Sequence, residues 1–403
     1  MMGPILWAWI DFSLRWLHVI AGIAWIGSSF YFVHLDSSLK RRDGLPTGAG
    51  GEAWQVHGGG FYHMIKYLVA PERMPDDLTW FKWEAYTTWL SGFALMVIIY
   101  YFSAELYLID NHVLPLPVWG AVAISVVGLI LGWAVYDGLC RSPLRDNDTA
   151  LAAAGFVFLV VLAWAFTLIF SGRGAYMQMG ALIGTIMAAN VLIVIIPNQK
   201  KVVADLIGGR TPDPKLGEQA KQRSLHNNYL TLPVLFVMIS NHYPLAFASR
   251  WNWLILALVL VVGALIRHFY NERHAGRPNP WWTWAVAAVG MLLIVWLSAA
   301  PPPGAAPGES AGAAPAQLDT AEIQNVVLSR CSMCHAEAPL WEGMAAPPKG
   351  VMLDTPERIR QHAGPIYLQA VLTHAMPPGN VTDIEPAERA LLGAWYDAGA
   401  PME

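Results

Sequence analysis

The sequence has little charge and few cysteines, and each shortage excludes a class of protein. Charged residues make up 13% of the 403 positions, about half the share found in soluble domains. The formal net charge of −4 gives no support for nucleic-acid binding. Three cysteines are too few for a disulfide framework. Neither a P-loop nor a G-x-G-x-x-G motif after a strand pattern is present, so no nucleotide-type cofactor is indicated. With 55% apolar residues, the composition is typical of an integral membrane protein.

Eight apolar stretches are long enough to cross a bilayer as helices, for which about 20 residues suffice. They lie near residues 8–35, 82–104, 116–139, 151–171, 175–197, 229–247, 251–270 and 281–300. The first is not a cleavable signal, because it is long and carries Asp11, Arg15 and His18. We therefore predict an all-α membrane domain of eight transmembrane helices over residues 1–300.

Basic residues gather in alternate loops and so orient these spans. The loops after the first, third, fifth and seventh spans are rich in Lys and Arg, whereas "SAELYLIDNHVLP" after the second is acidic. Loops that are rich in Lys and Arg stay in the cytoplasm. Both termini are therefore predicted to lie outside, which is an N-out, C-out topology.

The segment "CSMCH" at residues 331–335 has the spacing at which a c-type haem is attached. In such a site Cys331 and Cys334 form thioethers with the porphyrin, and His335 ligates the iron. A zinc site is the alternative, but it would need two further ligands, and the sequence contains no second C-x-x-C and no H-x-x-x-H. Bacteria attach haem c outside the cytoplasmic membrane, the side that the loop charges indicate. Cys140 is left alone, which is typical of a buried thiol.

The tail has the size and pattern of a small cytochrome. Residues 301–317 are rich in Pro, Ala and Gly and are predicted to form a flexible linker. Residues 318–403 are predicted to form a small all-α, class I-like cytochrome c domain. Its first helix ends at the haem motif, and an amphipathic closing helix, "EPAERALLGAWYDAGAP", packs on the first.

The sixth ligand of the iron has several candidates. Met376 in "AMPPGN" is favoured, since a thioether raises the haem potential and the prolines stiffen its loop. His374 is the main alternative, and Met344 and Met352 are others. Met333 lies inside the motif and is too close to reach across the ring.

Histidines in the first and sixth spans raise a second haem hypothesis. His18 and His34 are 16 residues apart, as are His226 and His242, and antiparallel packing would set His18 level with His242. A separation of 16 residues turns the side chains about 160° apart on a straight helix, which favours one haem b, between His18 and His242, over two. The other interpretation is that these histidines cap helices or line a polar cavity.

A second group of polar residues is predicted on the cytoplasmic side. It comes from the loop "GEAWQVHGGGFYHMIKY", from "DLTWFKWEAYTTW" and from "KQRSLHNNYLTLP". Its members are His63, Lys82, Glu84, Arg223, His226, Asn227 and Asn228. Amides, an arginine and flanking aromatics suit a flat, polar, anionic heterocycle. The alternative for Lys82, Glu84 and the tryptophans is an interfacial belt.

These strings together resemble one family. "RWLHVIAGIAWIGSSFYFVHLD", "WFKWEAYTTWLSG" and "SLHNNYLTLPVLFVMISNH", followed by "CSMCH" and "AMPPGN", resemble the membrane-bound bacterial urate oxidase (urate hydroxylase) family over essentially the whole chain. The resemblance implies oxidation of urate to 5-hydroxyisourate in purine catabolism, with electrons passed to the fused haem c and the respiratory chain instead of to hydrogen peroxide. It also implies Cys331 and Cys334 as thioether sites and His335 and Met376 as axial ligands. Pro378 departs from the pattern, where a leucine or similar residue is expected.

The resemblance supplies no catalytic residues for the membrane domain, so these rest on chemistry. Deprotonating a purine needs a general base, and His226 and His63 are the candidates, because imidazole titrates near neutral pH. Arg223, Asn227 and Asn228, with Lys82 and Glu84 nearby, are the predicted urate-binding residues. Further predicted partners are the bilayer and a downstream acceptor, either a soluble cytochrome c or a terminal oxidase. The predicted location is the bacterial inner membrane, with the cytochrome domain in the periplasm.

The side of urate entry decides whether a haem b is needed. Entry from the cytoplasm would require electrons to cross about 30 Å, which favours a haem at His18 and His242, whereas entry from the outer face would not. Two other functions share many of these features. A quinol-oxidising electron-transfer cytochrome would not require the cytoplasmic amide and arginine cluster. A transporter with a redox-sensing tail is disfavoured, because the spans show no obvious internal repeat.

Overall fold

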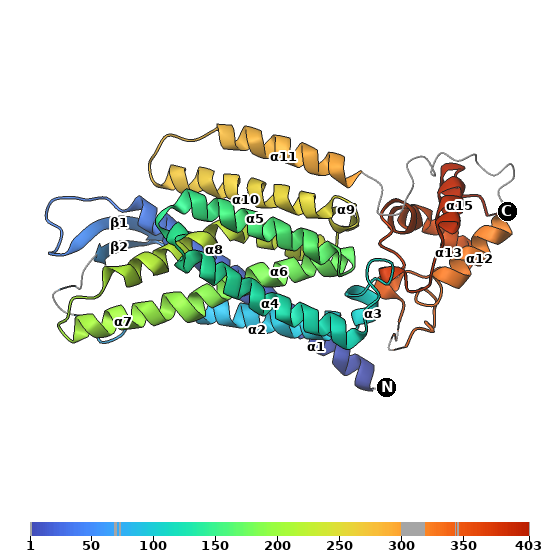
Figure 1. Cartoon of the computed structure of the whole chain (residues 1–403), viewed down its shortest axis with the longest axis horizontal. Helices are drawn as coiled ribbons and strands as arrows, with labels where there is room; N and C mark the ends of the chain where they lie inside the picture. The colour runs from blue at the N-terminus through green and yellow to red at the C-terminus, as the bar shows by residue number, and fades with distance from the viewer. Residues whose placement is uncertain are drawn as a thin grey trace.

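The computed structural model describes residues 2–67, 71, 74–299, 319–342, 344 and 346–402. Figure 1 shows a long helical bundle, residues 2–299, and beyond one end of it a smaller C-terminal unit, residues 319–402. The predicted linker, residues 301–317, lies outside the described residues.

The bundle is built from long helices that run back and forth along its axis (Figure 1). The long elements are α1 (Met2–Ser38), α2 (Trp83–Leu95), α4 (Val118–Arg141), α5 (Asp148–Thr167), α6 (Gly172–Ala189), α7 (Ile196–Ile207), α8 (Pro214–Ser240), α10 (Asn252–His274) and α11 (Trp282–Ser298). The short ones are α3 (Ala104–Tyr107), the 3₁₀ turn η2 (Pro143–Asp146) and α9 (Pro244–Phe247). There are two π-helical turns among the described elements of the bundle. The first, η1 (Met96–Tyr101), extends α2, and the second, η3 (Asn190–Ile195), joins α6 to α7.

All eight predicted spans fall on helical segments of the bundle. Five of the described helices are long and apolar enough to cross a membrane by length and composition. They are Ile5–Ser38, Val118–Arg141, Asp148–Thr167, Gly172–Ile207 and Asn252–His274. A mostly helical protein with several membrane-length helices is therefore confirmed.

The ends of these helices follow signals in the sequence. Asn147 begins α5, where its side chain accepts a hydrogen bond from the Ala150 N–H at 3.0 Å. Ser171 does the same for α6. Asp213 caps α8, whose first residue is Pro214, a favoured position for a residue without an N–H. Consequently α8 begins well before the apolar stretch at residues 229–247.

One segment is not helical. The glycine-rich stretch predicted as a loop forms an antiparallel hairpin of β1 (Ala49–His57) and β2 (Gly60–Tyr67), with His57 opposite Gly60. Gly58 and Gly59 make the turn with φ of 58° and 80°. A two-residue type I′ turn requires positive φ at both positions, so the glycines serve the turn. This hairpin corrects the expectation of an entirely helical membrane domain.

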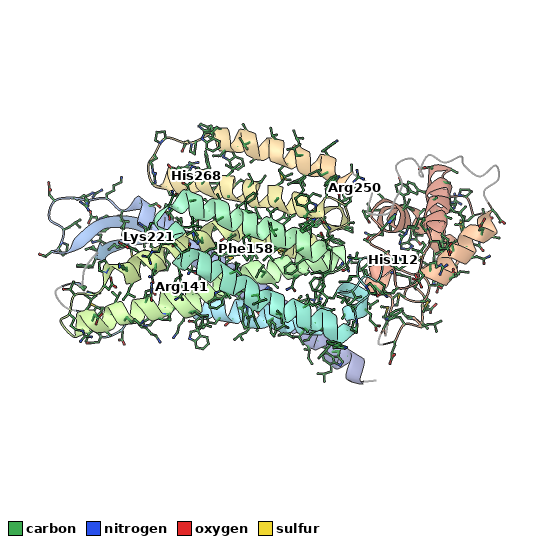
Figure 2. All side chains as sticks on the ribbon, viewed as in Figure 1. His112, Arg141, Phe158, Lys221, Arg250 and His268 are labelled. Carbon is green, nitrogen blue, oxygen red and sulfur yellow. The ribbon has the colours of Figure 1, made fainter. Side chains whose placement is uncertain are left out.

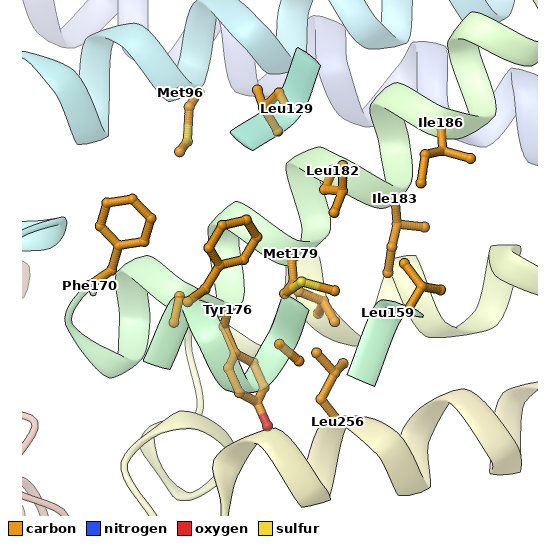
Figure 3. Close-up of a cluster of buried hydrophobic side chains, with 14 of the residues drawn as sticks. Met96, Leu129, Leu159, Phe170, Tyr176, Met179, Leu182, Ile183, Ile186 and Leu256 are labelled. Carbon is orange, nitrogen blue, oxygen red and sulfur yellow. The ribbon is translucent and has the colours of Figure 1, made fainter. Parts of the chain in front are cut away.

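The centre of the bundle is α6, which packs against α4, α5 and α8. Its Leu182, Ile183 and Ile186 are fully buried, and Figure 3 shows them among side chains from the neighbouring helices. Helices α8 and α10 also pack closely, where Pro233 of α8 faces Gly263 of α10. A Cβ on Gly263 would lie only 2.6 Å from Cδ of Pro233. Close packing of this kind is the main force between helices in lipid.

The C-terminal unit has its own core of apolar residues. Its elements are α12 (Thr320–Arg330), η5 (Pro348–Gly350), α13 (Pro356–Gln361), α14 (Ala363–Ile366), η6 (Tyr367–Leu372), η7 (Pro378–Asn380) and α15 (Pro386–Asp397). Ile323 of α12 and Leu392 and Trp395 of α15 are fully buried in one cluster. The first and last helices pack together as predicted, and Arg330 pairs with Glu388 at 3.0 Å across them.

Candidate functional site

A buried ion pair lies near the end of the bundle remote from the C-terminal unit. Arg223 of α8 donates from Nη2 to Asp137 Oδ1 of α4 at 2.7 Å and from Nη1 to Asn190 Oδ1 at 3.1 Å. Arg223 is 4% and Asp137 8% exposed. Figure 2 labels Arg141, one turn along α4 from Asp137, on the side away from His112. A buried charge needs such partners, because an unpaired one would be very costly.

The ion pair continues into a chain of hydrogen bonds that ends at a histidine. Asn190 Nδ2 donates to the Tyr136 hydroxyl at 3.0 Å and to Asn227 Oδ1 at 2.9 Å. Because the Tyr136 oxygen accepts from Asn190, its own proton is available for His226 Nδ1, 2.7 Å away. His226 is then a neutral imidazole with Nδ1 as the acceptor and the proton on Nε2. The arrangement presents a base that can receive a proton through Tyr136.

A pocket of about 290 Å³ opens beside this network. It is lined by Cys140, Arg141, Arg145, Ile193, Val194, Pro197, Asn198, Lys201, Leu216, Gln219, Gln222 and Arg223. Four of these are cationic, three are amides, and none of the lining residues that the structure describes is acidic. Asp137 is already shared between Arg223 and Arg141, which contacts it at 2.6 Å. Arg145 pairs with Asp146 at 3.4 Å. Four cations therefore face two carboxylates, and the pocket keeps a surplus of positive charge that suits an anion.

The π-helical turn η3 shapes one wall of the pocket. Asn190 at its start points into the buried network, whereas Ile193 and Val194 further along line the pocket. Asn198 and Lys201 of α7 follow in the same wall. A π turn holds one residue more than an α turn, and such turns are frequent at functional sites.

The structure brings together two of the predicted binding residues, Arg223 and Asn227, and one candidate general base, His226. Arg223 lines the pocket, His226 lies behind it, and Asn227 donates to the Met187 carbonyl at 2.9 Å within the network. Asn228 faces α10 instead, where Asn271 Nδ2 donates to its Oδ1 at 3.0 Å.

The other predicted residues lie elsewhere. Lys82 and Glu84 are at the start of α2, where the Lys82 ammonium lies 5.8 Å from the Trp83 ring. His63 is on β2, where it contacts Glu52 at 2.6 Å and stacks on Trp54 with 4.1 Å between ring centroids. None of the three lines the pocket.

The sequence reasoning missed several members of this site. Asp137, Tyr136 and Asn190 were not singled out, and Cys140, interpreted as a plain thiol, lines the pocket with its Sγ 3.9 Å from His226 Nδ1. Asp137 offered a signal, since an ionisable residue in an apolar span is usually functional.

The predicted haem b between His18 and His242 can be compared with the contacts of these residues. His18 Nδ1 contacts the Thr88 carbonyl at 3.0 Å and Ser91 Oγ at 3.1 Å on α2. Asn241, next to His242, accepts from the Tyr100 hydroxyl at 3.0 Å. Ser91 and Tyr100 are nine residues apart, about 14 Å along a helix, whereas two axial ligands must meet at one iron. The contacts of His18 and of the neighbour of His242 thus fall at different heights along α2 and η1, and His242 is exposed, so a haem b between them stays a prediction that these contacts do not support.

The C-x-x-C-H segment has the geometry that haem attachment needs. Cys331 immediately follows α12, and the N–H groups of Cys334 and His335 donate to its carbonyl at 3.2 and 3.0 Å. His335 Nδ1 lies 3.0 Å from the Val351 carbonyl, which can only accept. Nδ1 is therefore protonated, and Nε2 keeps a lone pair for a metal. These residues fit a covalently bound haem whose iron His335 would ligate.

The two leading candidates for the sixth ligand, Met376 and His374, lie in one loop that Arg389 holds. Arg389, 7% exposed, donates from Nη1 to the Met376 carbonyl at 2.9 Å. Burial, followed by the nearby Arg389 guanidinium, lowers the pKa of His374 to about 4. A neutral His374 can still ligate iron, so Met376 and His374 both stay predictions.

Comparison with known proteins gives one match. The family model described as "Urate oxidase N-terminal" matches residues 4–298, the whole helical bundle and its hairpin. No curated protein and no solved structure matches the chain.

Proposed function

Because the chain belongs to the urate oxidase N-terminal family, we propose that it is a membrane-bound oxidase that converts urate to 5-hydroxyisourate. Urate and one water give the product, two protons and two electrons. The electrons pass to a haem c in the C-terminal unit and then to a respiratory acceptor, a soluble cytochrome c or a terminal oxidase. The proposed location is the bacterial inner membrane, with eight spans, the N-terminus outside and the C-terminal unit in the periplasm.

The observation that carries this proposal is the cationic pocket beside Arg223. Its volume of about 290 Å³ is near the lower end of ligand pockets, which suits a single small heterocycle. The Gln219, Gln222 and Asn198 amides can hydrogen-bond the rim of a purine. The unbalanced guanidinium and ammonium groups favour the urate anion over a neutral purine.

His226 and Tyr136 supply the proton chemistry of this site. Oxidation releases two protons, so a base must lie close to the substrate. The Tyr136 hydroxyl faces His226 Nδ1 at 2.7 Å, so Tyr136 can give its own proton to that nitrogen as its oxygen takes one from the substrate. Asn190 and Asn227 hold the pair in place.

The C-terminal unit supplies the residues for the acceptor. Cys331 and Cys334 would hold a haem c, with His335 and Met376 as axial ligands. When bound, the haem accepts electrons one at a time, so urate oxidation proceeds in two one-electron transfers. Asp137 is 19 residues along α4 from Val118, about 28 Å. The pocket therefore lies most of the bundle length from the C-terminal unit, and the proposal includes an intermediate electron carrier in the bundle, the role predicted for a haem b.

The test uses two neighbouring lysines on α7. Lys201 lines the pocket, whereas Lys200 does not, and both are exposed. We expect Lys201→Gln to raise the urate concentration for half-maximal haem reduction about two- to fivefold, the size of a partly screened charge interaction. Lys200→Gln should match the wild type. The measurement is the haem α-band of anaerobic, detergent-solubilised protein after urate addition.

Two results would contradict the proposal. If both substitutions change the urate concentration for half-maximal haem reduction equally, the pocket does not bind urate. If urate leaves the wild-type haem oxidised while a quinol reduces it, the protein is instead a quinol-oxidising electron-transfer cytochrome.

A further inference from the structure

The loop that carries Met376 contacts the helical bundle directly. Residues 375–380 lie against residues 105–112, which comprise the end of α3 and the turn after it. Gly379 has φ of +55°, and a Cβ built on it would lie 2.6 Å from the Ile109 carbonyl oxygen and 3.2 Å from that of Glu105. Ala375 packs on the main apolar core of the bundle. Only glycine fits at position 379 without displacing one surface from the other.

A hydrogen bond joins the same two segments beside Gly379. Asn380 Nδ2 lies 3.0 Å from His112 Nε2. The amide can only donate, so His112 accepts with Nε2 and carries its proton on Nδ1. Figure 2 labels His112 at the end of the bundle that faces the C-terminal unit.

Within the C-terminal unit, the contact and the ligand loop are one rigid piece. Arg389 donates to the Met376 carbonyl at 2.9 Å and from Nη2 to Asn380 Oδ1 at 3.1 Å. Asn380 Nδ2 also donates to the Ile384 carbonyl at 3.2 Å. One asparagine therefore bonds both to the arginine that holds the Met376 backbone and to the bundle.

On the bundle side, the contacted segment is tied to the central helix. The Ser171 N–H donates to the Leu108 carbonyl at 2.9 Å, and its Oγ donates to the Tyr107 carbonyl at 2.8 Å. Ser171 is the N-cap of α6. The contact thus continues from α6, through residues 107–109, to Gly379, which is three residues from Met376.

We propose that residues 375–380 are the port through which electrons leave the bundle for the haem, with residues 105–112 as its fixed dock. The inference rests on the proposed function, because it needs a haem bound at His335 and electrons from urate. Since the dock covers this loop, the downstream acceptor must take electrons from another face of the C-terminal unit.

The test compares two left-handed glycines. Gly379→Ala adds backbone strain and a clash with Ile109, whereas Gly399→Ala, at φ +88° with no atom within 4 Å of its Cβ, adds strain alone. We expect Gly379→Ala to raise hydrogen exchange of the amides at residues 105–112 and to slow haem reduction by urate at least tenfold. Gly399→Ala should change neither, and both should keep the wild-type haem spectrum.

A second variant separates the contact from the folding of the C-terminal unit. His112→Ala alters only the bundle and removes the acceptor of Asn380. It should slow reduction about two- to fivefold, the loss expected for one exposed hydrogen bond. If Gly379→Ala alters the haem spectrum, the His112→Ala rate alone decides the proposal.

Each remaining outcome has one meaning. Faster exchange with an unchanged reduction rate would show that the contact exists but is not the port. Unchanged exchange and an unchanged rate in all variants would overturn the contact itself. Failure of urate to reduce the wild-type haem would instead overturn the proposed function, and the port with it.

Discussion

The bundle and the C-terminal unit both bury apolar side chains, but they differ in the large apolar residues that they expose and in the polar residues that they bury. In the bundle, Trp119 is 76% and Leu292 70% exposed, whereas Gln178, Asn190 and Asn228 are fully buried. In the C-terminal unit, apolar residues such as Trp395 and Leu392 fill the interior. One chain therefore contains two folds whose surfaces suit different solvents.

The difference teaches what stabilises each part. Water drives apolar side chains inward in the C-terminal unit, at about 25 cal/mol per Å² buried. Lipid is as apolar as leucine, so in the proposed bilayer the bundle would gain little from burying apolar surface and would depend on close packing and shared polar contacts. Its polar network is thus both a structural and a functional element.

Breaking one ion pair in each unit, buried in the bundle and partly exposed in the C-terminal unit, should give the largest contrast. Arg223→Met removes the buried partner of Asp137 and leaves it only the exposed Arg141, which should lower the free energy of unfolding by about 3 kcal/mol, the lower end of the cost of breaking a buried pair. Arg330→Met breaks a pair whose side chains are 26% and 21% exposed, and should cost about 1 kcal/mol or less. Denaturant unfolding of both variants in one detergent measures the two costs. Arg223→Met with Asp137→Asn should recover part of the loss, and equal costs for the two pairs would refute the contrast.

A lysine on the outer surface of each unit should give the next largest effect. Ile130, 59% exposed, is at the middle of α4, where a lysine costs about 2.5–3.5 kcal/mol in a bilayer. Leu328 of α12, 41% exposed, faces water, where such a change costs about 0.5 kcal/mol at most. The yield of folded protein in the membrane fraction should fall for Ile130→Lys and should equal that of the wild type for Leu328→Lys. Normal yield of Ile130→Lys would mean that this face of α4 does not meet lipid.

Adding one methyl group to a helix interior should give the smallest contrast. Gly263→Ala would place a Cβ 2.6 Å from Pro233 Cδ, whose ring cannot turn away, so we expect a loss of about 1–3 kcal/mol. Gly393→Ala meets Val371 Cγ1 at 3.2 Å, and the gain in helix propensity of about 1 kcal/mol should offset that contact. Thermal unfolding midpoints of the two variants test this. A rise in the midpoint for Gly263→Ala would show that α8 and α10 pack less closely than described.

Hydropathy predicted the helices well because apolar length is a local property. The hairpin was missed because "AGGEAWQVH" lacks a clean alternation of apolar and polar residues. Its turn was nevertheless readable, since paired glycines such as Gly58 and Gly59 between short runs are a hairpin signal. Caps such as Asn147 were equally local and marked where α5 begins.

The site was only half predictable, because it depends on how helices slide and turn against one another. Arg223 and His226 were found from one short string, but nothing in that string names Asp137 or Asn190, which come from other helices. For the same reason the spacing of His18 and His242 could not give their relative height. The hydrogen bonds of Thr88 and Tyr100 place their contacts at different levels along α2 and η1.

Because η3 is a π-helical turn, the pocket depends on the number of residues between α6 and α7. Each residue turns a helix by about 100°, so removing one residue from η3 would leave α7 helical and equally apolar. The removal would nevertheless rotate Asn198 and Lys201 away from the pocket while Asn190 stayed in its network. A relative of this chain could therefore keep every side chain of the site and still lack the site, through a gap of one position in the alignment.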